Sequence, residues 1–447
     1  MNAIVIGAGP DELVAAHLLA RAGHHVTVLR EYSSPDLDDG WVMPSIVREL
    51  EVGGFETHQP DPWLRTPLPD GGTLELRRDM GRSVESIRRV SPHDAQQWPA
   101  FAERMGAVAA LLERIYSGPA PGLVDLRFAL KIRSLGRRGM EDLMRWLPMP
   151  VAELLDDWFE CDALKGALAA LALRNLQQGP RSAGTALHLL HFHAGNPPGV
   201  LRPPHSNISE RLRALPGLQA RESKVARITV RAGRTAGVVL ESGEELPASL
   251  VVSGADPKRT LADLVEPGWL DPELVRATRN VRNRGVAAKL VVEHRSNFDT
   301  LTIAPSLDYV ERAYDDAKYG RVSAQPFVDV TANEMHVQYA PHGCGTHDEV
   351  RERAVATLGS QLGPVEITEV LLPADLEQRF GWPEGQPHQA ELTLDQALWM
   401  RPLPELARYS TPIEGLWLCG PAMHPGAGVV AASGYNCAKQ ILSKLRA

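Results

Sequence analysis

The sequence predicts an α/β fold, in which an open parallel sheet is flanked by helices and further structure is inserted along the chain. A continuous apolar run at 3–6 leads through a glycine turn into a helical pattern, as a buried parallel strand followed by a helix does. Strand patterns return at 224–252 after a mainly helical stretch. A strand at 416–418, a glycine-rich loop and a helix follow near the end of the sequence. The chain is therefore expected to enter one parallel sheet three times.

The first part of the sequence predicts one β-α-β unit. A strand at 3–6 precedes a helix at 13–22, which ends at Gly23, and a second strand follows at 25–29. A right-handed crossover of this kind implies a ligand crevice at the carboxyl ends of the strands.

The other elements divide the chain into segments. The stretch 98–215 is mainly helical, 224–252 reads as a small meander that returns to the main sheet, and 286–339 alternates strands with loops. The predicted segments are a first part of the parallel-sheet domain, a helical insert, a second part, a mixed-sheet substrate domain and a C-terminal part, at 1–97, 98–215, 216–280, 281–395 and 396–447.

Composition favours a globular protein. Of 447 residues, 44% are hydrophobic and 23% are charged, which is typical of a folded domain rather than a disordered chain. Lys+Arg 47 against Asp+Glu 55 gives a net charge of −8, so nucleic acid is not expected as a partner. The cysteines form no CxxC pair, no signal peptide is predicted and no apolar run reaches membrane-spanning length. A reducing, cytoplasmic location is expected.

The turn Gly7-Ala8-Gly9 is typical of a dinucleotide-binding site. The first glycine permits a tight turn, and the second lets a pyrophosphate approach the backbone at the positive end of a helix. Glu12 holds the third glycine position, and the acid expected to hold a ribose is displaced to Glu31. An ordinary tight turn in an α/β protein is the alternative.

Two carboxylates begin the helix after this turn. Asp11 and Glu12 lie where they favour the helix dipole and would also occupy the anion site. Like charges about 4 Å apart repel by ~1 kcal/mol in water and ~4 kcal/mol at an effective dielectric near 20. They are therefore expected to weaken the binding of a diphosphate unless both side chains turn outward.

The stretch 411–428 contains a strand, a glycine-rich turn and the approach to a helix, whose free N–H groups point into the same crevice. Together with the N-terminal unit, it resembles the phytoene desaturase and retinol saturase group of flavoproteins, within the amine-oxidase-like FAD fold. The likeness extends to the segments 251–257, 338–341 and 395–402. It implies a Rossmann-like FAD-binding domain with an inserted mixed-sheet substrate domain and a helical layer.

The resemblance implies FAD laid across the sheet, with its diphosphate over the first glycine turn, its adenine near the backbone of Val225 and its isoalloxazine near 424–429. His424 is the catalytic candidate, because the loop aims it at the flavin edge, and a structural role in that turn is the alternative. The implied cofactor contacts are Gly7, Gly9, Pro10, Glu31, Val225, Gly420, His424, Gly426, Gly428 and Val429.

Several of the positions that should face the cofactor depart from the group's pattern. The segment 36–41 has one glycine and three carboxylates where a paired-glycine motif is usual. The loop 202–207 lacks the glycines that often lie against the flavin, and Pro421 stands where an acid is common.

The sequence also contains a group of histidines and a basic segment. His188, His191 and His193 have a spacing that fits no paired metal-ligand set, so pocket-lining or hydrogen-bonded core histidines are expected and no metal site is predicted. The segment 123–135 has the composition of a basic amphipathic helix that rests on an anionic membrane; a packed helix with a solvated basic edge is the alternative.

The leading hypothesis is an FAD-dependent oxidoreductase of the desaturase or saturase type. It would act on a lipophilic unsaturated substrate, such as a polyene, in a tunnel with apolar walls that include Trp158, Phe192 and Trp399. The departures motivate an alternative, a flavoprotein-like fold that has lost FAD and acts as a cofactor-free isomerase or cyclase, or as a non-catalytic partner. A lipid carrier is the third hypothesis, and the sequence does not indicate an oligomeric state.

Overall fold

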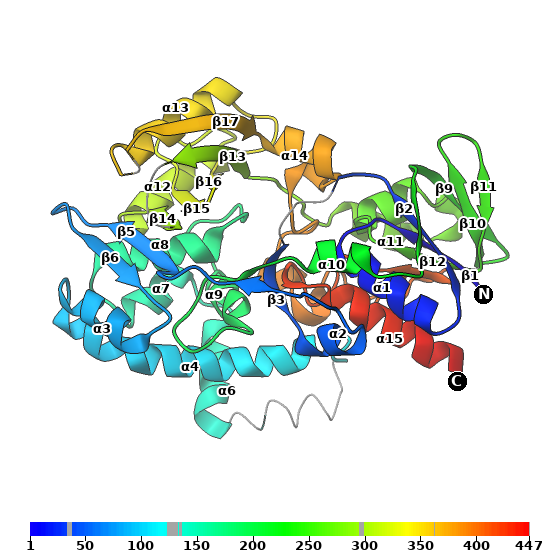
Figure 1. Cartoon of the computed structure of the whole chain (residues 1–447), viewed down its shortest axis with the longest axis horizontal. Coiled ribbons are helices and arrows are strands. Elements are labelled where there is room, and N and C mark those ends of the chain that lie inside the picture. The colour runs from blue at the N-terminus through cyan, green and yellow to red at the C-terminus, as the bar shows by residue number, and fades with distance from the viewer. Residues whose placement is uncertain (34–37, 123–132, 134–135, 295–298, 362, 447) are drawn as a thin grey trace.

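The computed structural model describes residues 1–33, 38–122, 133, 136–294, 299–361 and 363–446. Figure 1 shows two halves between which the chain crosses several times. The proximal half is built on a five-stranded parallel sheet and carries both chain termini, and the distal half is built on a second five-stranded sheet.

The parallel sheet has the strand order β18-β12-β1-β2-β8. Strands β1 (Asn2–Ile6) and β2 (His25–Arg30) pair in parallel, and β12 (Leu250–Ser253) pairs with the other side of β1. Strand β18 (Leu416–Leu418) follows β12. Its strands come from the start, the middle and the end of the chain, so the predicted α/β fold is confirmed.

Helix α1 (Pro10–Arg21) covers this sheet and packs against α15 (Ala432–Arg446) (Figure 1). Proline suits the first helical position, because its N–H would have no partner there and its φ is already helical. The residues at 11–19 are all buried, since α1 lies between the sheet on one side and α15 on the other.

A separate three-stranded antiparallel sheet follows the helical layer, as the sequence predicted. It consists of β9 (Val225–Arg231), β10 (Arg234–Leu240) and β11 (Glu245–Pro247). Strand β8 (Gln219–Glu222), at the edge of the parallel sheet, was not predicted, because its four residues show no apolar alternation.

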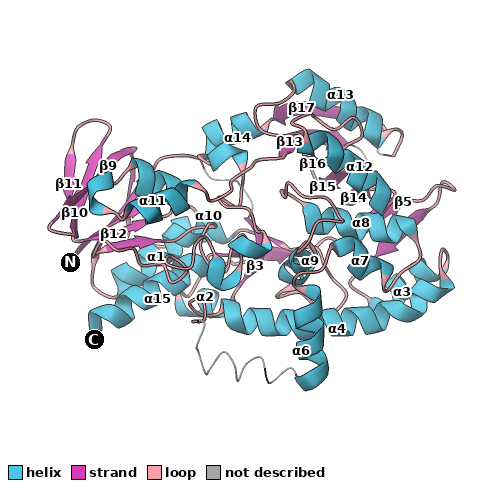
Figure 2. Cartoon of the chain, turned by 180° about the vertical axis from the view of Figure 1, so that it is seen from behind, coloured by secondary structure: helices cyan, strands magenta, loops and turns pink. Residues whose placement is uncertain are grey.

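Helices form the base of the distal half (Figure 2). The longest is α4 (Pro92–Tyr116), which begins after Ser91, whose side chain accepts a hydrogen bond from the Asp94 N–H. The other helices of this layer are α3 (Met80–Arg88), α6 (Gly136–Trp146), α7 (Val151–Asp156), α8 (Asp162–Leu173) and α9 (Ala186–His193). A hairpin of β5 (Leu64–Pro67) and β6 (Thr73–Leu76) joins them.

The distal sheet has the order β14-β15-β16-β13-β17, and every pair in it is antiparallel. The sequence predicted a mixed sheet here, since strand patterns alone do not give strand direction. Its strands are β13 (Ala287–His294), β14 (Thr300–Ile303), β15 (Val328–Thr331), β16 (Glu334–Gln338) and β17 (Val365–Leu371). Helices α12 (Leu307–Lys318), α13 (His347–Leu358) and α14 (Pro373–Phe380) accompany it.

A small sheet lies between the halves, where β3 is visible at the centre of Figure 1. Strand β3 (Asp38–Val42) pairs in parallel with β19 (Gly428–Val430), and β7 (His205–Ser206) pairs with both β3 and β4 (Thr57–His58). A Cβ at Gly40 would lie 2.6 Å from the Gly428 carbonyl oxygen, so this close pairing requires glycine. The shorter helices α2 (Pro44–Glu49), α10 (Ile208–Ala214) and α11 (Pro272–Arg279) belong to the proximal half.

The segment 123–135, predicted as a basic amphipathic helix, lies outside the described residues except for Arg133. Among the described helices, none is both long enough and apolar enough to cross a membrane.

Candidate functional site

A cavity of about 840 Å³ runs from the carboxyl ends of β1 and β12 to the turn between β15 and β16. Seven of the predicted cofactor contacts line it: Gly7, Gly9, Pro10, Glu31, Gly426, Gly428 and Val429. The other three, Val225, Gly420 and His424, are not among its lining residues. The structure therefore brings the first and last glycine turns of the sequence to one space, as the motifs predicted.

The turn between β1 and α1 presents bare backbone to this cavity. Gly7 has a φ of +106°, and its N–H donates to the Leu29 carbonyl at 2.8 Å, which fixes the turn against β2. Only glycine adopts this backbone conformation without strain. Gly9 precedes the first turn of α1, whose free N–H groups form the positive end of the helix.

Glu12 fills the space that these glycines leave. A Cβ at Gly7 would lie 2.9 Å from its Cγ, and a Cβ at Gly9 would lie 2.7 Å from its Oε2. A Cβ at Gly254, after β12, would overlap the same carboxyl, and one at Gly420 would lie 3.3 Å from Oε1. The Glu12 carboxyl is thus enclosed by four glycines, which we call the glycine cradle (Gly7, Gly9, Gly254 and Gly420).

The cradle keeps Glu12 away from water. Burial raises the pKa of Glu12 to about 8, and the neighbouring Asp11 carboxyl raises it further, whereas the backbone N–H groups of Glu12 and Gly9 oppose the shift. At neutral pH Glu12 is therefore mostly the uncharged acid.

Asp11 turns away from the cradle and toward α15. Its Oδ1 accepts a hydrogen bond from the Gly434 N–H at 2.9 Å, in the first turn of α15. Burial raises the pKa of Asp11 to about 6, although this hydrogen bond lowers it. Of the two carboxylates, Asp11 thus turns away from the predicted anion site, which the sequence left open, because its carboxyl binds the end of a different helix.

Glu31 and Val225, predicted to hold ribose and adenine, are in direct contact. The Glu31 Oε1 accepts a hydrogen bond from the Val225 N–H at 2.7 Å and lies 3.1 Å from Arg259 Nη2. Arg259 also lines the cavity, and sequence reasoning missed it. The signal available was its position just after the segment 251–257, which carried part of the family resemblance.

The C-terminal loop places His424 behind the cavity wall. Its side chain is fully buried, its ring lies 5.9 Å from the Tyr116 ring, and burial lowers its pKa to about 4. Its carbonyl accepts a hydrogen bond from the Tyr409 hydroxyl at 3.0 Å. His424 is not among the residues that line the cavity, and these contacts fit the structural alternative.

The other histidines singled out in the sequence also pack in the core. His191 Nε2 lies 2.6 Å from the Ala427 carbonyl, so this nitrogen carries the proton, and Nδ1 accepts from the Tyr116 hydroxyl at 2.8 Å. Burial lowers the pKa of His191 to about 4. The neutral ring therefore links α4 and α9 to the C-terminal glycine loop. His193 Nδ1 lies 2.9 Å from the Val200 carbonyl.

The distal end of the cavity combines apolar and charged groups. Phe192 lines it, as expected, together with Leu171, Phe380 and Trp382. Trp158 and Trp399 do not line it: Trp158 packs against Phe101 at 5.5 Å between ring centroids, and Trp399 packs against the core. Arg174 and Lys289 face the same space, so the cavity wall combines apolar side chains with two cationic ones.

Arg202, in the loop expected to lie against the flavin, is instead buried in an ion pair. Its Nη1 and Nη2 bind the two carboxylate oxygens of Asp329, in β15, at 2.8 and 2.7 Å. Burial raises the pKa of Asp329, but the Arg202 charge outweighs it and leaves that pKa well below its usual range. Arg202, just before β7 of the small sheet between the halves, therefore binds β15 of the distal sheet.

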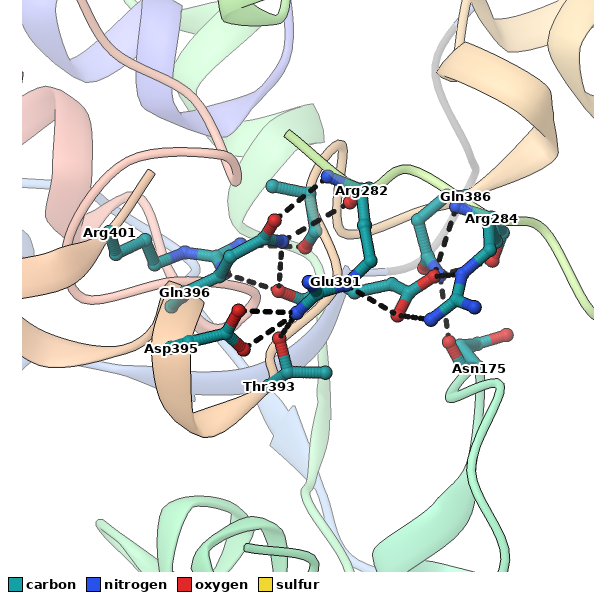
Figure 3. A network of polar contacts seen from close by, with 10 residues as sticks. Asn175, Arg282, Arg284, Gln386, Glu391, Thr393, Asp395, Gln396 and Arg401 are labelled. Atoms are coloured by element: carbon teal, nitrogen blue, oxygen red, sulfur yellow. Dashed lines mark hydrogen bonds and ion pairs between the residues drawn. The ribbon is translucent and has the colours of Figure 1, made fainter. Parts of the chain in front are cut away.

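Figure 3 shows the network that joins two crossings between the halves. Glu391 is fully buried and receives two hydrogen bonds from Arg284, at 2.6 and 2.8 Å. Arg401 is also fully buried and donates to the carbonyls of Glu391 and Gln396 at 3.3 and 3.0 Å. The chain entering the distal half at 281–286 is thus bound to the chain leaving it at 386–401.

Comparison with known families gives one match over most of the chain. The model described as "Flavin containing amine oxidoreductase" matches residues 66–442. The Rattus norvegicus protein named pyridine nucleotide-disulfide oxidoreductase domain-containing protein 2 is 27% identical, over 100% of this chain and 94% of its own length. A phytoene desaturase (neurosporene-forming) from Cereibacter sphaeroides is 22% identical, over 99% of this chain and 94% of its own length.

Solved structures share the fold at low identity. An oxidoreductase from Methanosarcina mazei has a TM-score of 0.61 and 14% identity, over 99% of this chain and 100% of its own. A putrescine oxidase variant, redesigned in its cofactor binding, has a TM-score of 0.61 and 12% identity, over 100% of this chain and 98% of its own.

Proposed function

Because this chain belongs to the flavin containing amine oxidoreductase family, we propose that it is an FAD-dependent oxidoreductase acting on a carbon–carbon bond of an unsaturated substrate with an apolar body. The cavity carries the proposal, since it joins the glycine turn of the β-α-β unit to an apolar region at Phe192 and Phe380. When bound, FAD supplies hydride transfer. The part of this chain is to align the substrate and to exclude water.

The residues present fit FAD at both ends of the cavity. At one end, the Glu31 carboxyl and the backbone of Val225 would hold an adenosine, and the turn at Gly7 and Gly9 would hold a diphosphate beside the Glu12 carboxyl, which lies against both glycines. At the other end, the loop 426–429 lines the cavity with backbone. Between these two ends, the cavity fits a dianionic diphosphate only while Glu12 is uncharged. Burial of Glu12 in the glycine cradle favours this uncharged form.

The substrate class follows from the distal end of the cavity and from the relatives. Phe192, Leu171 and Phe380 offer an apolar wall, and desaturases are among the similar proteins. Arg174 and Lys289 line the same space, so a substrate with a polar group at one end suits it better than a pure hydrocarbon.

The test is FAD binding by the purified full chain. We expect a flavin absorption band that stays with the protein through gel filtration, or saturable quenching of FAD fluorescence when FAD is added. Bleaching of the bound flavin by an unsaturated lipid without oxygen would then identify the substrate. If neither the wild type nor the Glu12→Gly variant took up FAD, the proposal would be overturned.

The position of Glu12 also favours a second candidate, a family member that has lost FAD and acts as a cofactor-free isomerase or as a partner of an active relative. A carboxyl enclosed by the glycine cradle replaces the glycine of the dinucleotide motif. Conversion of a polyene without a redox change, by protein free of flavin, would support this second candidate.

A further inference from the structure

We propose that Glu12 is a nucleotide-contacting residue whose carboxyl donates a hydrogen bond to the diphosphate of FAD, so that the nucleotide binds only when Glu12 carries its proton. This inference rests on the proposed function, because it presupposes that FAD enters the cavity.

The position of the Glu12 carboxyl is fixed by the residues around it. Its carboxyl lies within the glycine cradle, lines the cavity and is next to the first N–H groups of α1. The side chain has 5% of its surface exposed, so it does not extend into solvent as a surface glutamate does. A diphosphate that approaches the turn at Gly7 and Gly9 therefore meets this carboxyl.

The chemistry decides which form of Glu12 a diphosphate accepts. A carboxylate has only acceptor oxygens, and so do the phosphates, so the two repel each other. A protonated carboxyl has one O–H, which can donate a hydrogen bond to a phosphate oxygen. The neutral acid thus adds a donor to the N–H groups of the helix end.

Burial favours the neutral form of Glu12 and raises its pKa to about 8, and Asp11, from the same helix, raises that pKa further. The backbone N–H groups of Glu12 and Gly9 and the Cys419 thiol act in the opposite direction and lower it. Cys419, from the loop after β18, lies 3.8 Å from Oε1, and its own pKa lies well above 9. From β1 and β12, the facing residues are Gly7 and Gly254, which do not titrate.

Proton linkage then makes the affinity depend on pH. Below about pH 8 Glu12 already carries its proton, and FAD binds without proton exchange. Above that pH the proton must be taken up from solvent, so the Kd should rise about tenfold per pH unit. The nucleotide's negative charges hold the proton more tightly once they are bound.

The experiment measures the Kd of FAD, ADP and adenosine from about pH 6 to about pH 10 for the wild type, Glu12→Gln and Glu12→Gly. We expect the rise above pH ~8 for FAD and ADP with the wild type, a flat profile for adenosine, and flat profiles for all three ligands with Glu12→Gln. Above about pH 8, calorimetry in buffers of different ionisation enthalpy should show proton uptake by the wild type only. Glu12→Gln is the matched control, because it keeps the shape and removes the titration.

Each other outcome has a defined meaning. A flat wild-type profile, or the same slope with Glu12→Gln, would overturn the inference and leave FAD binding intact. Binding by Glu12→Gly but not by the wild type would show that Glu12 excludes the nucleotide, which also overturns it. Failure of all three proteins to bind FAD would instead reject the proposed function.

Discussion

The Oε1 atom of Glu12 lies 3.8 Å from the Sγ of Cys419, and both side chains are buried at the base of the cavity. Burial raises the pKa of Cys419 well above 9, and the Glu12 carboxyl adds to the shift. At neutral pH an uncharged acid therefore faces an uncharged thiol.

Thiol labelling should distinguish this buried cysteine from the accessible ones. Cys419 and Cys437 are buried, whereas Cys161 and Cys344 are half-buried. Because only an accessible thiolate attacks a disulfide reagent, we expect Cys161 and Cys344 to react in the native protein and the other two only after unfolding. Ellman's reagent and mass spectrometry measure this. Rapid labelling in a Cys161→Ser/Cys344→Ser double variant would contradict the burial described above.

The stability of the apo protein should fall as pH rises through the titration of Glu12. The folded pKa, about 8, lies above the ordinary value of 4.5, so the unfolded chain releases this proton first. The free energy of unfolding should therefore decrease between these pH values, by at most about 1.4 kcal/mol per pH unit. Urea unfolding of the wild type and of Glu12→Gln over this range is the measurement. A constant difference between them would show that Glu12 ionises at the same pH in both states.

Tyr116→Phe should destabilise the fold without changing its shape. The substitution removes the hydroxyl that donates to His191 Nδ1 and leaves that buried nitrogen without a partner. We expect a loss of about 1–3 kcal/mol in the free energy of unfolding. Tyr319→Phe is the matched control, because Tyr319 is 68% exposed and should show almost no change. Equal effects of the two substitutions would contradict this role for Tyr116.

Arg284→Ala should weaken the junction between the two halves. It removes two hydrogen bonds from the fully buried Glu391. Since Arg284 is itself 42% exposed, solvent screens part of the interaction, and we expect a cost of about 1–3 kcal/mol. The control is Arg276→Ala, which breaks an exposed pair with Glu273 and should cost less than about 1 kcal/mol. Thermal unfolding of the two variants measures the difference. An equal loss of stability would contradict the role of the Arg284–Glu391 pair in joining the two halves.

Local patterns were enough to predict the parallel sheet and its glycine turns, except for the edge strand β8. The apolar runs at 3–6 and 416–418 become β1 and β18, and the glycine turns that follow them converge on one cavity. A parallel strand order brings the carboxyl ends of such strands together, so their distance in sequence does not matter. Glu12 was singled out for the same reason, since its place in the motif fixes its place in the fold.

Side-chain partners far apart in the sequence could not be predicted. Arg202 was read as part of a loop beside the flavin, but it pairs with Asp329, 127 residues later. Asp11 was expected at the anion site, but it binds the backbone of Gly434, 423 residues later. Such choices depend on which helix end or carboxylate lies nearby in three dimensions, and a single sequence does not reveal that.

The hydrogen bond from Gly434 to Asp11 has a consequence for biosynthesis. Helix α1 gains its packing partner α15, and Asp11 gains its backbone donor, only when the ribosome has added the 423 residues that separate Asp11 from Gly434. During translation the β1–α1 unit exposes the apolar surface that α15 later buries, and exposed surface of this kind promotes aggregation of partly folded chains. The hydrogen bond from Gly434 therefore forms only after α15 has been made, and a truncation before residue 434 would remove it and uncover α1.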